Sequence, residues 1–175
     1  MAERICGGWR AVVVDTFYFG DCRIEKRAWL FALLLATTGE RPLGTQASQL
    51  AAAARWLAER KEVAGPVQVE ARGPRACTIA LVAAAMEPKH IGGLTLQGSF
   101  ASLKELIERD VSASTMPEMF CFGLLKAADI KQMAALIAPR PVRFINPTER
   151  HRQTLSELKR WYATLGVPFD PLGSN

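Results

Sequence analysis

The sequence holds few residues suited to bind a metal ion. Its 175 residues include two histidines, His90 and His151, and four cysteines, at positions 6, 22, 77 and 121, with no C-x-x-C pair among them. A structural zinc site needs four such ligands clustered at short spacings. We therefore expect no metal ion and no bound cofactor, and reduced thiols that are mostly buried.

Long apolar runs are also absent. The longest run, residues 29–36, is far too short to cross a bilayer, which takes about 20 apolar residues. Residues 1–8 lack the apolar segment of a signal peptide. The expectations are therefore a chain without a membrane partner and a cytoplasmic location.

Basic residues are in modest excess and are not concentrated. There are 22 Lys and Arg against 17 Asp and Glu, a net charge of +5, without a lysine-rich tail. The densest basic stretch, residues 140–160, also contains Glu149 and Glu157, which is typical of a solvated helix face. Because no nucleic-acid-binding motif accompanies the charge, we predict no nucleic-acid partner.

Composition and pattern indicate a single α/β domain over residues 1–175. Hydrophobic residues make up 49% of the chain and charged residues 22%, as in ordinary globular proteins. Short β-type runs alternate with helical periods, which predicts a parallel sheet of about four strands flanked by helices. The expected strands are residues 9–17, 66–72, 91–97 and 141–146. The first contains Val12, Val13 and Val14, and a continuous β-branched run is typical of a strand covered on both faces.

Helices are expected between these strands. Residues 27–38 favour a helix, and residues 39–44 favour a loop. The clearest helix spans residues 46–61, with Thr45 as its cap and one buried stripe formed by Leu50, Ala53, Ala54 and Leu57. Another begins directly after Gly73, and the last ends at Gly166. Residues 100–139 predict short helices and loops.

A very tight turn joins the second expected strand to the helix that follows it. The turn contains Gly73, Pro74, Arg75, Ala76 and Cys77. Functional sites of parallel α/β folds form at the carboxyl ends of strands. In such a turn, the nucleophile elbow G-x-S-x-G holds its serine at the N-terminus of a helix, whose free N–H groups stabilise an oxyanion.

Several segments match one family when they are taken in order. They are residues 42–57, 67–91, 98–102, 129–130, 136–141 and 146–148. These segments resemble α/β-hydrolases, and within that superfamily the acetyl xylan esterase and prolyl oligopeptidase-like branch. The resemblance covers about residues 9–166. It implies a hydrolase-type parallel sheet and hydrolysis of carboxylic esters by a serine, an acid and a histidine.

The sequence departs from the family at the residues that perform catalysis there. Arg75 stands where the nucleophile belongs, and a guanidinium stays protonated and cannot attack an ester. Cys77 replaces the last glycine of the motif, and Glu149 is a possible acid. In the family, the catalytic histidine follows a further strand, and additional strands precede the first strand expected here. Neither feature is found in this sequence. We therefore predict an incomplete hydrolase-like core with no catalytic residue and a vestigial elbow of Gly73, Arg75 and Cys77.

The predicted function is that of a degenerate, non-catalytic module that acts in binding or assembly. Open edges of an incomplete sheet are adhesive, so we expect a homo-oligomer or a second chain that completes the sheet. The alternative is an acetyl esterase-like carboxylic-ester hydrolase whose site is completed by another chain, or by Cys77 or Ser99 as the nucleophile. A third possibility is anion binding by Arg75, since Arg forms bidentate bonds to carboxylate and phosphate.

Ordinary structural roles are expected for most of these residues taken singly. We expect Arg75 to point to solvent, Cys77 to be a packed thiol, and His151 to be exposed beside Glu149. His90 is expected at the opposite end of the sheet from the elbow. Turn or cap roles are expected for Ser99 and Ser102, and core packing, with a groove or interface as the alternative, for Met116, Met119, Phe120 and Phe122.

Overall fold

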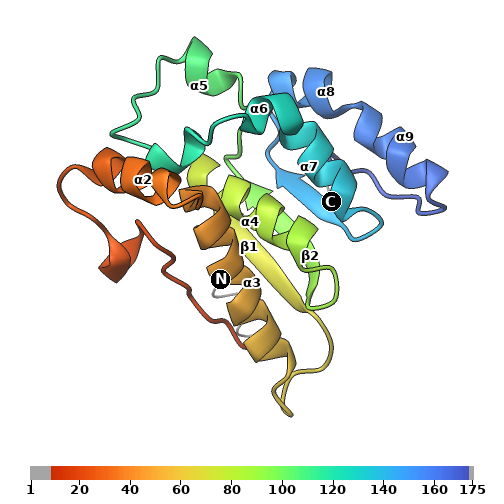
Figure 1. The fold of residues 1–175 in the computed structure, drawn as a ribbon. Coiled ribbons are helices and arrows are strands. Elements are labelled where there is room, and N and C mark those ends of the chain that lie inside the picture. Colours follow the sequence, from red (N-terminus) through yellow and green to blue (C-terminus); the bar gives the residue numbers. More distant parts are fainter. Residues whose placement is uncertain (1–8, 174–175) are drawn as a thin grey trace.

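A three-stranded parallel sheet forms the centre of the molecule. The computed structural model describes residues 9–173. Its strands are β1 (Val67–Arg72), β2 (Ile91–Gln97) and β3 (Val142–Ile145), in the order β1-β2-β3 (Figure 1). The α/β class and three of the expected strands are confirmed, and the sheet has three strands rather than about four.

The strand expected at residues 9–17 is wrong. The chain pairs with no strand there, and Val12 and Val13 are 55% and 74% exposed. A β-branched run favours a strand only where a neighbouring strand supplies hydrogen bonds and packing partners. This run forms no ladder with a described strand, so its local preference is not realised.

Helices on one face bury the sheet. Between β1 and β2 the chain forms α4 (Pro74–Met86), which packs against both strands and lies between α3 (Pro42–Ala58) and α7 (Ile130–Ile137) (Figure 1). Because side chains alternate along a strand, Val69 and Ala71 of β1 face these helices. Gln68, Glu70 and Arg72, which alternate with them, are exposed, so the described residues cover β1 on one face only.

Most of the remaining helices lie near the expected positions with shifted ends, but the 3₁₀ turn at residues 20–22 was not expected, and the single last helix that was expected is divided in two at Ser156. They are η1 (Gly20–Cys22), α2 (Ala28–Thr37), α5 (Glu105–Glu108), η2 (Pro117–Met119), α6 (Leu124–Ala127), α8 (Glu149–Leu155) and α9 (Glu157–Thr164). Helix α3 starts before the expected residue 46 because Pro42, with its fixed φ, occupies its first turn. Thr45 therefore lies inside the helix and does not cap it. The short helices expected within residues 100–139 are confirmed.

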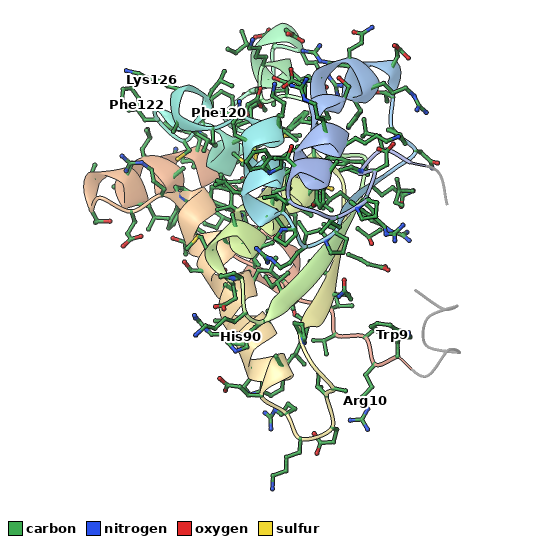
Figure 2. The ribbon with its side chains drawn as sticks, turned by 90° about the vertical axis from the view of Figure 1, so that its right-hand side faces the viewer. Trp9, Arg10, His90, Phe120, Phe122 and Lys126 are labelled. Atoms are coloured by element: carbon green, nitrogen blue, oxygen red, sulfur yellow. The ribbon has the colours of Figure 1, made fainter. Side chains whose placement is uncertain are left out.

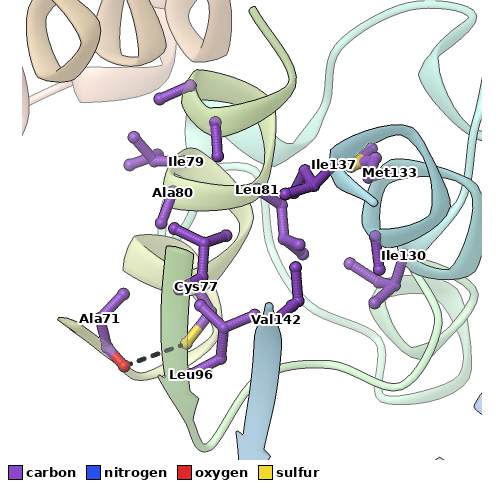
Figure 3. Packing of buried hydrophobic residues seen from close by; sticks show 14 of the residues in the cluster. Ala71, Cys77, Ile79, Ala80, Leu81, Leu96, Ile130, Met133, Ile137 and Val142 are labelled. Atoms are coloured by element: carbon purple, nitrogen blue, oxygen red, sulfur yellow. Dashed lines mark hydrogen bonds between the residues drawn. The ribbon is translucent and has the colours of Figure 1, made fainter. Parts of the chain in front are cut away.

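The hydrophobic core lies between the sheet and α4 and α7. Figure 3 shows Leu81 of α4 and Ile137 and Met133 of α7 above Leu96 and Val142 of the sheet. The outer edge of β3 is partly covered, because the Phe144 N–H donates to the Pro171 carbonyl at 2.9 Å. Within residues 9–173, no helix has the length and apolar character needed to cross a membrane.

Candidate functional site

The predicted elbow, residues 73–77, forms a strand–turn–helix junction. Gly73 has φ +82° and ψ 159°, a conformation that is strained for any residue with a side chain. Its N–H donates to the Gln97 carbonyl at 2.8 Å, which holds the turn against the end of β2. Pro74 then begins α4. The sequence therefore places Arg75 in the first turn of a helix at the carboxyl end of the sheet.

We expected Arg75 to point to solvent, but its side chain is partly buried and is paired with a carboxylate. Its guanidinium donates through Nε and Nη2 to both oxygens of Glu118, the Nη2–Oε2 distance being 3.1 Å. Glu118 is completely buried, and the Phe19 ring lies over the guanidinium at 4.5 Å. An external anion would have to compete with this carboxylate. Anion binding at Arg75 stays a prediction.

A buried tyrosine completes the surroundings of this ion pair. Tyr18 is 4% exposed and its hydroxyl donates to the Ala28 carbonyl at 3.0 Å. Burial, and secondarily the negative charge of Glu118, raise the pKa of Tyr18, so the phenol stays protonated. The segment before α2 thus places the Phe19 ring over Arg75 and a buried tyrosine near the ion pair.

Cys77 is the packed thiol that its position predicts. It is completely buried, and its S–H donates to the Ala71 carbonyl at 3.4 Å (Figure 3) and lies 3.5 Å from the Gln97 carbonyl. Burial raises the pKa of this thiol to about 12. A thiol nucleophile reacts as the thiolate, which is scarce at neutral pH when the pKa is this high.

The structure brings Ser99 and His151 together across 52 residues of sequence. Ser99 follows β2, and its Oγ lies 3.1 Å from Nε2 of His151 in the first turn of α8. His151 is 7% exposed, so the expectation of an exposed histidine is wrong. The ring is buried because it packs near Phe144 and completes the cap of α8. Burial lowers the pKa of His151, which favours the neutral ring.

The other ring nitrogen of His151 determines which tautomer is present. The backbone N–H of Thr148 donates to Nδ1 at 3.3 Å, and the Thr148 hydroxyl lies 2.7 Å from the same nitrogen. A backbone N–H can only donate, so Nδ1 is an acceptor and the proton of the neutral ring sits on Nε2. That proton points at Ser99 Oγ. In this tautomer the imidazole donates to the serine and cannot take its proton.

Two carboxylates near this pair bind backbone N–H groups. Glu105 accepts from the Ala101 N–H at 2.7 Å and is paired with Arg109, while Asp129 accepts from the Leu103 N–H at 2.6 Å. Ser102 donates to Asp129 at 2.5 Å, a turn contact of the kind expected for it. These carboxylates fix the loop after β2.

The possible acid, Glu149, lies on the exposed side of α8. Its Oε1 accepts from Gln153 within the same helix at 3.4 Å. In a catalytic triad an acidic side chain would contact Nδ1 of His151. Here Thr148 makes that contact. Sequence reasoning overlooked Thr148, because the capping-box signature has Glu or Gln three residues after the threonine and this chain has His151 there.

His90 lies before β2, at the end of the sheet away from the elbow (Figure 2). Its Nδ1 contacts Glu87 at 2.8 Å, and Arg55 reaches the same carboxylate at 2.9 Å. Arg140 donates to the carbonyls of Ala84 and Ile91, both at 2.8 Å. These contacts join the end of α4 to the start of β2.

No group of three or more potential ligand residues within positions 9–173 could hold a metal ion.

Comparison with known proteins matches the chain to no protein family, no curated protein and no solved structure. The α/β-hydrolase resemblance therefore rests on the sequence segments described above. The function has to be argued from the site itself.

Proposed function

We propose that this chain is a non-catalytic α/β-hydrolase-like module that acts in binding or assembly. The observation that carries the proposal is the Thr148 N–H donated to Nδ1 of His151, because it directs the Nε2 proton toward Ser99. A serine is activated only when the histidine offers a free nitrogen to accept the hydroxyl proton. The histidine closest to the elbow thus serves as a helix cap.

The elbow supports the same proposal. Arg75 at the nucleophile position is neutralised by Glu118, and the Cys77 thiol is buried with a raised pKa. Neither residue supplies a nucleophile to a substrate at the surface. Both make contacts that stabilise the turn, so the elbow serves as a structural junction.

The second candidate is a carboxylic-ester hydrolase that uses Ser99 as nucleophile. One observation favours it: the Ser99 Oγ to His151 Nε2 distance of 3.1 Å is a hydrogen-bond distance of the kind found between nucleophile and base. This function would require His151 to exchange tautomers and leave its contact with the Thr148 N–H.

Hydrolysis of 4-nitrophenyl acetate separates the two functions. We expect purified protein to show no turnover above background, and the same result for Ser99→Ala and Cys77→Ala. Turnover that is lost in Ser99→Ala or in Cys77→Ala would overturn the proposal and identify the nucleophile. Turnover retained by both variants would also overturn it and would place the nucleophile elsewhere.

A further inference from the structure

Helix α2 is apolar on all sides and none of its residues is buried. Its sequence, Ala-Trp-Leu-Phe-Ala-Leu-Leu-Leu-Ala-Thr, contains one polar residue, at the end. The helix rests on the protein through its partly buried side, which contains Ala28, Ala32 and Leu35. Leu30 is also partly buried, whereas Trp29, Phe31, Leu33 and Leu34 are exposed to solvent. A helix that is apolar all round is normally buried.

A second group of exposed aromatic residues lies next to this helix. Helix α2 contacts η2, and Figure 2 shows Phe120 and Phe122, which directly follow η2, beside the end of α2. Met119 packs in the core as expected, whereas Phe122 is 93% exposed. Phe120 and Phe122 therefore match the interface alternative for this cluster. We call α2 together with Phe120 and Phe122 the α2 surface.

The α2 surface is large enough for a stable protein interface. Its six large exposed side chains have exposed fractions from 42% to 93%: Trp29, Phe31, Leu33, Leu34, Phe120 and Phe122. They present about 700 Å² if a whole large side chain offers roughly 200 Å². The largest apolar patch of a typical monomer is about 300–600 Å², and a standard interface buries about 800 Å² on each partner.

The chemistry of α2 favours a protein over a lipid surface as its partner. An interfacial membrane helix needs a charged face opposite its apolar face, and α2 has none. The ten residues of α2 rise about 15 Å, half of what a bilayer core requires. We therefore expect α2 to be buried against the surface of another protein, and that surface should itself be apolar.

A second copy of the chain meets this need with its own α2 surface. We infer that two copies associate about a two-fold axis, with their α2 helices antiparallel, an inference that rests on the proposed assembly function. Exposed Lys26 and Arg27 precede α2, and exposed Glu40 follows it. Antiparallel pairing places the basic end of one helix beside Glu40 of the other and aligns the helix dipoles favourably.

The test measures molar mass and ester hydrolysis on the same samples. We expect the wild-type chain to sediment as a dimer at about 100 µM, and Leu33→Glu and Phe122→Glu to sediment as monomers because each places a charge in the contact. The matched control is Leu136→Glu on α7, which alters a leucine that is also more than half exposed and should leave the dimer intact. Circular dichroism checks that each variant is folded.

Mixing complementary variants keeps the inference testable if one variant folds poorly. Position 33 is near the middle of α2, so it lies near position 33 of the second copy in an antiparallel pair. An equimolar mixture of Leu33→Glu and Leu33→Lys should regain the dimer mass. A monomeric wild type, a dimer that survives both charged substitutions, or a mixture that stays monomeric would overturn the α2 pairing. Ester turnover would instead overturn the proposed function.

Discussion

Residues 67–98 and residues 9–40 are both rich in apolar side chains, yet they differ in how far these side chains are buried. In the first region, β1, α4 and β2 bury Cys77, Leu81 and Leu96 completely. In the second, Val13 and four large side chains of α2 are exposed. In the first region, a strand, a helix and a second strand pack against one another. The second contains a β-branched run that pairs with no described strand, and an apolar helix that contacts η2 and α3 through one side only.

Polar groups differ between the regions in the same way. The elbow pairs Arg75 with a buried carboxylate supplied by a segment more than 40 residues away. The charged residues around α2 are exposed. We therefore expect the first region to contribute most to stability, and the exposed parts of the second, residues 12–14 and α2, to contribute little. The predictions below test this division.

The largest loss of stability is expected from Arg75→Ala. The substitution leaves Glu118 buried without its partner, and breaking a buried ion pair costs about 3–5 kcal/mol of unfolding free energy. Urea unfolding measures the loss. The variant Arg75→Ala with Glu118→Gln should recover part of it, because the unpaired charge is removed. An Arg75→Ala loss under about 1 kcal/mol would contradict the pairing, since exposed pairs contribute no more than that.

The next comparison sets one leucine of the core against one of α2. Leu96→Ala removes a completely buried side chain between β2 and the helices and should cost about 2–5 kcal/mol. Leu34→Ala changes a side chain that is more than half exposed, and in a dilute, monomeric sample it should stay within about 0.5 kcal/mol of wild type. Equal losses in the two variants would show that α2 is packed in the monomer.

A smaller, pH-dependent effect is expected from His151. Burial lowers its pKa below the ordinary value of 6.5, so the unfolded chain binds the proton more readily than the folded one. Stability from this group is complete above pH 6.5 and falls as the pH decreases through the folded pKa. His151→Gln should reduce the loss measured by thermal melting between pH 7 and pH 5. An unchanged pH profile would contradict a buried, neutral histidine.

The smallest effect is expected at an exposed ion pair on the helical surface. Lys131 Nζ lies 3.0 Å from Glu157, and both side chains contact solvent. Lys131→Ala should change the unfolding free energy by less than about 1 kcal/mol, and added salt should reduce the difference further. A loss comparable to that of Arg75→Ala would remove the distinction between buried and exposed pairs.

Local pattern was sufficient for the elements that pair with their neighbours in the chain. The strands near 67–72 and 91–97 and the helix after Gly73 were predictable because hydrophobic periodicity and the glycine turn act over a few residues. The strand expected at 9–17 was wrong because strand formation also requires a neighbouring strand. The same limit applied to His151, whose burial depends on Phe144 and on the loop that carries Ser99.

The sequence by itself determined the α/β class, the tight turn at Gly73 and the absence of a nucleophilic serine at position 75. These follow from residue identity and short-range spacing. Only the tertiary structure decided that Arg75 pairs with Glu118, that Ser99 meets His151 and that α2 is left exposed. Each of these depends on contacts between residues far apart in the chain, and local propensity carries no information about which distant side chain will fill a given space.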